Sequence, residues 1–457
     1  MPKFIKFLQF IFLFLILTPS FSQAAAQTQE VQSEQTLQVL DNLKKNIQLI
    51  TLSNGLRVVF TKRDTAPVFT GQIHVKVGGV NEPLGKSGVA HMLEHQAFKG
   101  TKVIGVTKDN EFGIIYNENG GVNLNAGTAK DLTYYTVSLP SNAFELWCWM
   151  ESDRLLNPVF RQFDKERDVV LEERYMRVDN DPSGQLYEAL LAVSFLSHPY
   201  RVPTIGWASE VSKLQLQDVQ DFYAQYYRPD NMVISLVGNL EVETIKPLLE
   251  RYFGRIPVKT SPLPQIITQE EPQRGERRIE VQFEAQPQFM IAYHKPSYPD
   301  PDDISFSLLH SILNQGRSSI FNQELVRDQK LALGVSTLEV PGSLYPSVFM
   351  VSAMPRNGVS NEQLISAIQQ IFERLKTELV SAEVLAAAKR REQMDFLSLL
   401  ETNDSLAFVL GQSELFYGDK YEFFKTYELI LATTAEDLRK IARKYLNLHQ
   451  RTIAEIK

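Results

Sequence analysis

The sequence predicts an α+β protein built from two related domains. The helical segment Leu216–Tyr226 matches Ala435–Tyr445 at a fixed offset of 219 residues, and a β-rich segment follows each, at 232–236 and 451–455. A repeat of helix, turn and strand at one period indicates duplication of a domain. Residues 257–278, rich in Pro, Thr, Gln and Glu, are typical of a linker between the two copies. We therefore expect domains at 45–256 and 279–457.

The N-terminus is expected to direct export. Lys3 and Lys6 precede a mostly apolar stretch, which is followed by small residues ending Ala24-Ala25-Ala26. This order describes a secretory signal peptide over residues 1–26. The apolar run is shorter than the about 20 residues that a membrane span needs. We expect a periplasmic or secreted protein, with an uncleaved membrane anchor as the alternative, and a flexible polar leader at 27–44.

Composition narrows the possible partners. A net charge of −7 over 457 residues, without a run of Lys or Arg, gives no support to nucleic-acid binding. Hydrophobic content of 44% and charged content of 22% are ordinary for a globular protein. The single cysteine, Cys148, lies in an apolar segment and is expected to be a buried small hydrophobic residue.

The strongest chemical signal is an H-x-x-E-H pattern at His91, Glu94 and His95, within a run of helical periodicity. Residues four apart lie on one face of a helix, so the two imidazoles can reach one metal ion. Glu94 falls beside them and can reach a water molecule at the metal. Two nitrogen ligands and a carboxylate base suit zinc-assisted hydrolysis, and this inverted order is the inverzincin signature. The alternative is a helix that merely carries two histidines.

A zinc site of this kind needs a third protein ligand. A second helix, rich in acidic residues, is expected at 164–174. It carries Glu166 and Glu173 seven residues apart, on one face. One of them can bind metal while the other supports a histidine ligand. Alternatively, the segment is an ordinary solvated helix face.

Together, GVAHMLEHQAFKGT at 88–101 and ERDVVLEER at 166–174 resemble the pitrilysin/insulinase family of zinc metallopeptidases. In that family a helix of the form E-R-x-V-x-x-x-E follows the motif by roughly 75–80 residues. The resemblance implies that Glu173 is the third zinc ligand, with Glu172 the weaker alternative, and that Glu166 supports a histidine. It also implies two mostly antiparallel sheets with packed helices, facing each other as a clamshell.

The same resemblance assigns substrate contacts. The segment from Asn125 and Ala126 to Tyr135 is similar to the family's N-A-x-T…D-x-T-x-Y strand, whose edge pairs with an extended peptide. Alternatively, this segment is a plain hairpin. Arg327 matches a substrate-binding arginine, but Leu333 or Gly334 stands where the family has a tyrosine. That departure puts in doubt the transition-state hydrogen bond that a tyrosine would give.

These observations predict a zinc endopeptidase that acts on extended peptides, with Glu94 as the proton shuttle. We expect it to work as a homodimer or as a heterodimer with a related chain. The alternative is a non-catalytic subunit of such a pair. A third possibility is an envelope binding protein whose zinc pattern is vestigial.

Overall fold

The computed structural model describes residues 40–457, of which residues 48–457 form one compact unit. The predicted signal peptide and residues 27–39 of the leader lie outside the described residues. The rest of the leader is not irregular, because residues 40–46 are helical, with Leu40 and Leu43 on one face. No helix within the described residues is both long and apolar enough to cross a membrane.

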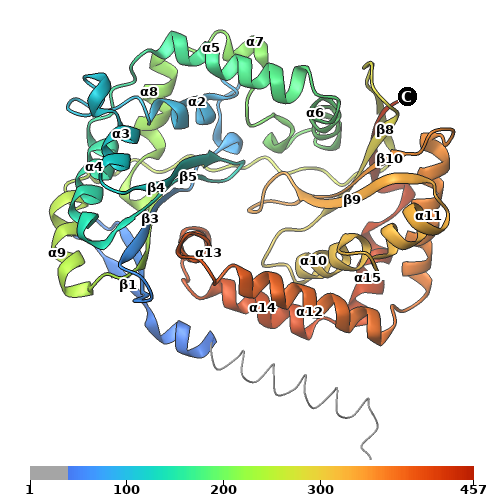
Figure 1. Cartoon of the computed structure of the whole chain (residues 1–457). Coiled ribbons are helices and arrows are strands. Elements are labelled where there is room, and N and C mark those ends of the chain that lie inside the picture. The colour runs from blue at the N-terminus through green and yellow to red at the C-terminus, as the bar shows by residue number, and fades with distance from the viewer. Residues whose placement is uncertain (1–39) are drawn as a thin grey trace, which may run out of the picture. The chain divides into compact units, whose positions relative to one another are not determined.

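The N-terminal half, residues 48–256, is built on a six-stranded sheet in the order β1-β2-β6-β3-β5-β4 (Figure 1). β2 and β6 run parallel, whereas β3 pairs antiparallel with β5 and β6, and β4 pairs antiparallel with β5. The strands are β1 Ile47–Thr51, β2 Arg57–Lys62, β3 Val68–Val75, β4 Val122–Thr128, β5 Thr133–Pro140 and β6 Met232–Gly238. β4 is therefore an edge strand.

The C-terminal half, from β7 onward, repeats this topology in a five-stranded sheet in the order β7-β11-β8-β10-β9. β7 and β11 are parallel, and the other pairs are antiparallel. The strands are β7 Arg277–Glu280, β8 Gln288–Lys295, β9 Ala332–Val340, β10 Ser347–Pro355 and β11 Arg451–Ile456. Because β2-β6-β3-β5-β4 and β7-β11-β8-β10-β9 match in order and direction, the predicted pair of related, mostly antiparallel α+β domains is confirmed.

The helices follow the same repeat. α8 and α15 have the bounds expected from the sequence, and α5 and α12 also begin 219 residues apart. The helices of the first half are α2 Val89–Gln96, α3 Phe112–Glu118, α4 Phe144–Leu156, α5 Phe163–Arg174, α6 Pro182–Ser194, α7 Ala208–Val211, α8 Leu216–Tyr226 and α9 Val242–Phe253. Those of the second half are α10 Pro301–Asn314, α11 Asn361–Thr377, α12 Ala382–Ser398, α13 Asn403–Tyr417, α14 Glu422–Ala432 and α15 Ala435–Tyr445.

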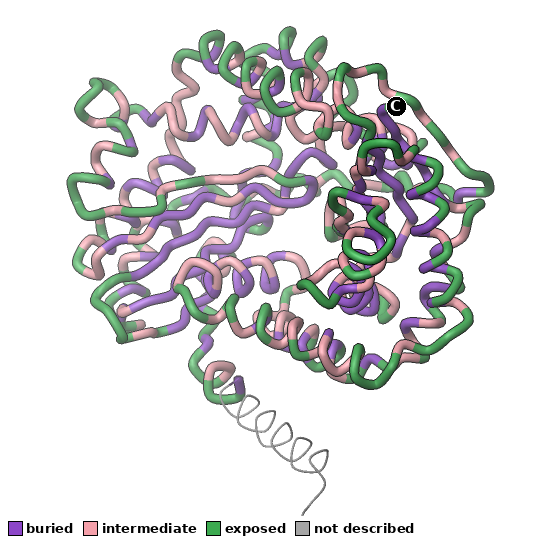
Figure 2. Tube along the Cα trace, turned by 45° about the vertical axis from the view of Figure 1, so that its right-hand side comes forward, coloured by how far each residue is buried: buried purple, intermediate pink, exposed green. Residues whose placement is uncertain are grey.

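Each half has its own apolar core, seen as the buried strands and inner helix faces in Figure 2. In the first half, Trp147 of α4 lies against Gly71 of β3, where a β-carbon would come within 2.5 Å of the indole ring. Cys148 beside it is a buried free thiol, as the sequence predicted. Met92 and Leu93 of the motif helix belong to the same core as the strands of the first sheet.

The two halves exchange one helix each. α13 of the second half packs on β3 and β6 of the first sheet, and α6 of the first half packs on β8 and β11 of the second (Figure 1). Polar contacts secure both: Arg57 on β2 pairs with Glu414 on α13 at 2.6 Å, and Arg277 on β7 donates to the carbonyl oxygen of Val193 on α6 at 3.0 Å. The exchanged helices hold equivalent places in the repeat.

A candidate zinc centre

The motif helix α2 presents its chemical residues on one side. Val89, Ala90, Met92, Leu93 and Gln96 are buried, whereas His91, Glu94 and His95 are only partly buried. Burial of each large apolar side chain contributes about 1.5–3 kcal/mol to stability. This burial fixes the rotation of α2, so that the face with His91, Glu94 and His95 points away from the core.

The start of α2 is built tightly. Gly88 takes the left-handed conformation with φ 85°, and a β-carbon there would lie 2.7 Å from the carbonyl oxygen of Ile205. The Glu82 carboxylate accepts hydrogen bonds from the N–H groups of Gly88 and Ala90, each at 3.0 Å. These bonds satisfy donors that a helix start otherwise leaves unpaired.

Helix α5 brings the third side chain. Glu173 Oε2 lies 3.7 Å from His91 Nε2 and 3.4 Å from His95 Nε2, so the two imidazoles converge on one carboxylate oxygen. The donor atoms of His91, His95 and Glu173 all lie within 4.8 Å of one another, and they form the one such group among the described residues. Glu172, the alternative ligand, is exposed on another face of α5.

This donor set fits zinc. Bonds of 2.0–2.1 Å in a tetrahedron separate neighbouring donors by about 3.3 Å, close to the distances between the histidine nitrogens and Glu173. Three protein ligands leave one position open, as catalytic zinc sites require. Bound there, zinc would polarise a carbonyl oxygen and lower the pKa of water.

Glu166 is hydrogen-bonded to His95, one of the two histidines of the motif. Its Oε1 lies 2.9 Å from His95 Nδ1, and its Oε2 is 2.5 Å from Lys99 Nζ. An Nδ1–H that donates to Glu166 leaves Nε2, the nitrogen on the Glu173 side, as the atom that can bind a metal. Burial disfavours the charged imidazole, yet hydrogen bonds to Glu166 and Glu173 raise the pKa of His95 to about 9.

Arg177 holds the other oxygen of the third ligand. It lies on η4 (Tyr175–Asp179), a π-helical turn that continues α5, and its Nη1 is 2.8 Å from Glu173 Oε1. Hydrogen bonding with His95 lowers the pKa of Glu173, against the effect of burial. Glu173 thus keeps its charge, with Oε2 alone turned to both histidines.

Glu94 contacts the edge strand rather than the other acidic residues. Its Oε2 accepts a hydrogen bond of 2.7 Å from Thr128 Oγ1, at the end of β4. Burial raises the pKa of Glu94, and the Thr128 hydrogen bond counteracts part of that rise. Oε1 makes no hydrogen bond within residues 40–457, so one carboxylate oxygen remains available to accept a proton.

The structure places the predicted substrate contacts in different settings. Asn125 and Ala126 lie on the edge strand β4, opposite Thr136 and Tyr135 of β5, and α2 packs against this strand. Arg327 is exposed in the second half, on η7 (Phe321–Asp328), and contacts none of the metal-site residues in the part of the chain described. Its proposed role remains a prediction.

The second half carries altered counterparts of the site. At the offset of 219 residues, His310 corresponds to His91 and Glu392 to Glu173, but Leu313 and Asn314 replace Glu94 and His95. His310 is hydrogen-bonded to Thr337 through Nδ1 at 2.6 Å. The second copy therefore lacks the base and one ligand, and the repeat offset was the signal that sequence reasoning overlooked.

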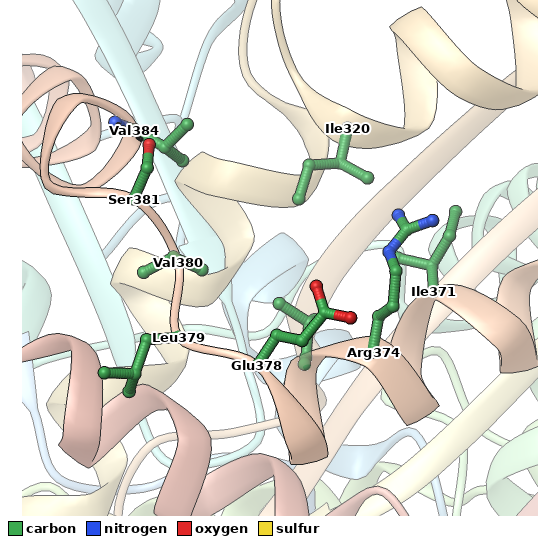
Figure 3. A pocket seen from close by; sticks show the side chains of 9 residues that line it. Ile320, Ile371, Arg374, Glu378, Leu379, Val380, Ser381 and Val384 are labelled. Atoms are coloured by element: carbon green, nitrogen blue, oxygen red, sulfur yellow. Dashed lines mark hydrogen bonds between the residues drawn. The ribbon is translucent and has the colours of Figure 1, made fainter.

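A small pocket lies apart from these residues. It has a volume of about 150 Å³ and lies in the second half. Figure 3 shows side chains that line it, among them Ile320, Ile371, Arg374, Glu378 and Val384. It is mainly apolar and contains none of the metal-site residues. The candidate site is therefore identified by the convergence of His91, His95 and Glu173 and not by this pocket.

Three further residues contact the site, although the sequence analysis gave them no role. Thr128 and Lys99 both stand in segments that carry the family resemblance, but their contacts with Glu94 and Glu166 join distant parts of the chain. Arg177 lies four residues after Glu173, a spacing that predicts a pair on one helix face.

Comparison with known proteins agrees with this arrangement. Residues 57–206 match the family model described as insulinase (peptidase family M16), and residues 213–392 match the one described as peptidase M16 inactive domain. The second match includes Leu313 and Asn314, which stand in place of Glu94 and His95.

Relatives cover nearly the whole chain. Zinc protease PqqE of Helicobacter pylori is 30% identical over 89% of this chain and 92% of that protein. The beta subunit of the mitochondrial-processing peptidase of Lentinula edodes is 25% identical over 89% of this chain and 88% of its own. A crystal structure of a protease from H. pylori superposes with a TM-score of 0.85, at 28% identity, over 90% of this chain and 99% of its own. The chain therefore belongs to the insulinase family, peptidase family M16.

Proposed function

We propose that the protein is a zinc-dependent endopeptidase that hydrolyses extended peptides or unfolded segments. One observation carries the proposal: His91 and His95 converge on Glu173, with the carboxylate of Glu94 next to them on α2. Relatives named zinc proteases support a peptidase role at the level of the family. Zinc, when bound, would supply the Lewis acid.

The chain's own residues would share the work as follows. Asn125 and Ala126 on the free edge of β4 pair with the backbone of an extended substrate, as strand addition requires. Glu94 Oε1 takes a proton from the attacking water and passes it to the leaving amine. Glu166 keeps His95 in the required tautomer, and Arg177 fixes Glu173.

The test compares wild-type protein with Glu94→Gln. Wild type should hold about one zinc per chain and cleave a quenched peptide. The variant should hold the same amount of zinc but lose at least about 10²-fold in kcat, because the amide cannot accept the proton. Glu118→Gln, an exposed change on α3, serves as the matched control. Metal-free wild type that takes up no zinc, or equal cleavage by Glu94→Gln, would refute the proposal.

A second candidate function is a non-catalytic or weakly active subunit of a paired peptidase. The absence of a tyrosine at Leu333 and Gly334 favours it, since the second half then lacks a hydrogen-bond donor that the family supplies. In that case purified chain would bind zinc but cleave only after a related chain is added. Cleavage by the isolated chain would exclude this candidate.

We further propose an exported protein that works as a homodimer or as a heterodimer with a related chain, possessing a signal peptide at residues 1–26. The periplasmic protease PqqL from Escherichia coli shares the fold, with a TM-score of 0.73 over 90% of this chain and 47% of that one. Light scattering of the purified protein tests the pairing. N-terminal sequencing tests cleavage of the signal segment and, if it is retained, the predicted membrane association.

A further inference from the structure

We propose that Thr128 is a positioning residue that sets the carboxylate of Glu94 for proton transfer. The proposal rests on the proposed function, because it assigns Glu94 the role of base. It starts from one contact: the Thr128 hydroxyl donates to Glu94 Oε2 at 2.7 Å. This is the one hydrogen bond of the Glu94 side chain within the described residues.

Glu94 needs such a partner. The terminal torsion of a glutamate is broad, so helix α2 fixes the Cα–Cβ direction but not the orientation of the carboxylate. A general base must lie within about 2.6–3.2 Å of the proton it takes. The hydroxyl of Thr128 holds Oε2, while Oε1 makes no hydrogen bond within the described residues.

Thr128 itself is held firmly. It is the last residue of β4 and pairs with Thr133 of β5. The turn that follows is anchored from outside, because the carbonyl oxygens of Ala129 and Lys130 accept hydrogen bonds from the N–H groups of Gly79 and Val80 at 3.1 and 2.9 Å. A hydroxyl on so fixed a backbone can define the position of a neighbouring side chain.

Thr128 lies on the strand proposed to bind substrate and also contacts the proposed base, Glu94. Asn125 and Ala126, the residues proposed to pair with substrate, belong to the same strand. A peptide that adds to the edge of this fixed strand therefore meets Glu94 in the orientation that Thr128 sets. Substrate backbone, edge strand and base form one continuous hydrogen-bonded unit.

Substitution separates positioning from a merely structural role. Thr128→Val keeps the shape and removes the hydroxyl, so kcat should fall about 10-fold to 100-fold, as expected for a small misplacement of a reacting group. KM should stay within about 3-fold, since the strand backbone is unchanged, and zinc content should equal that of wild type. Thr128→Ser, which retains the hydroxyl, should restore most of kcat.

Thr136→Val is the matched control. The Thr136 hydroxyl also donates to a carboxylate at 2.7 Å, but that carboxylate belongs to Asp404 and not to Glu94. This control loses the same kind of bond and should keep kcat. A Thr128→Val enzyme with wild-type kcat, or a loss equal to that of Thr136→Val, would overturn the proposal.

A readout independent of activity completes the test. In crystals of metal-free protein, the Glu94 carboxylate should occupy one orientation in wild type and Thr128→Ser, and a different or split one in Thr128→Val. An unmoved carboxylate in Thr128→Val would refute positioning even if kcat fell. Absence of zinc uptake and cleavage in wild type would instead refute the proposed function, while the crystals still decide whether Thr128 orients Glu94.

Discussion

Glu172 and Glu173 are neighbours in sequence but differ in surroundings. Glu173 faces two imidazoles, whereas Glu172 is exposed. We expect Glu173→Gln to abolish tight zinc binding, because an amide oxygen is a poorer zinc ligand than a carboxylate, and Glu172→Gln to leave the zinc content nearly unchanged. Metal analysis after dialysis measures both. Zinc loss in Glu172→Gln alone would contradict the assigned ligand set.

Glu166 contacts His95 from outside the donor group, so its substitution should have a milder effect. Glu166→Gln should weaken zinc affinity or activity by about 10–100-fold, as is usual for residues that orient a metal ligand. Competition with a chelator measures the affinity. Glu271→Gln, in the connecting segment, provides the exposed control, and equal affinities in the two variants would exclude a supporting role for Glu166.

The relative positions of residues close together in the sequence were predictable. His91, Glu94 and His95 share one helix, so their spacing fixed their relative positions. Glu173 was identified through resemblance, since no local rule brings α5 to α2. The Thr128–Glu94 contact could not be predicted, because it depends on where a hairpin 34 residues away ends.

At the scale of the element, the beginning of α2 depends on one acidic side chain. Glu82 accepts the N–H groups of Gly88 and Ala90. Glu82→Ala leaves both donors unpaired, and we expect a loss of about 2 kcal/mol or more in the free energy of unfolding. Urea unfolding measures this loss.

Glu243→Ala is the control for that prediction, because Glu243 is an exposed acidic residue in the first turn of α9. It should cost well under 1 kcal/mol. Equal losses in the two variants would show that the Glu82 bonds add nothing specific to α2.

Elements were predicted best where periodicity and duplication agreed. The bounds of α8 and α15 follow from the repeat, whereas the helical turn at 40–46 was missed because the polar composition of the leader suggested irregular chain. The π-helical turn of η4 has no sequence signal of its own, and it decides where Arg177 points.

At the scale of the whole molecule, a buried histidine lies where the halves meet. His74 on β3 packs against Phe408 and Gly411 of α13, and its Nε2 is 3.0 Å from Gln72 Oε1. The titratable groups facing this region are Tyr134 of β5, stacked on the ring, and Asp404, which is bonded to Gln72. Burial lowers the pKa of His74 to about 3.

The sign of the pH effect follows. Below the ordinary histidine pKa of about 6.5 the unfolded chain takes up a proton that the folded chain refuses, so stability falls with pH down to about 3. Between pH 6.5 and 5 the loss from this group is about 2 kcal/mol. His74→Gln should remove that part of the pH dependence in urea unfolding. An unchanged dependence would mean that other groups govern acid sensitivity.

The sequence indicated two related halves but gave no sign that they exchange helices. α6 and α13 are largely covered on all sides and lack one distinct apolar face, so nothing local states which sheet each will cover. That choice depends on the path of the chain between the halves, which residue patterns do not encode.

Because of this exchange, we expect the two halves to stay associated after the chain between them is cut. A protease that cuts the connecting segment at 257–276 would leave α6 seated on the far sheet and α13 on the near one, so the nicked molecule should stay in one piece. Either half produced alone would expose the sheet face that the other's helix normally covers, and would need the missing partner to remain in solution. Each of the two related halves thus depends on the other, because each sheet is covered by a helix that the other half supplies.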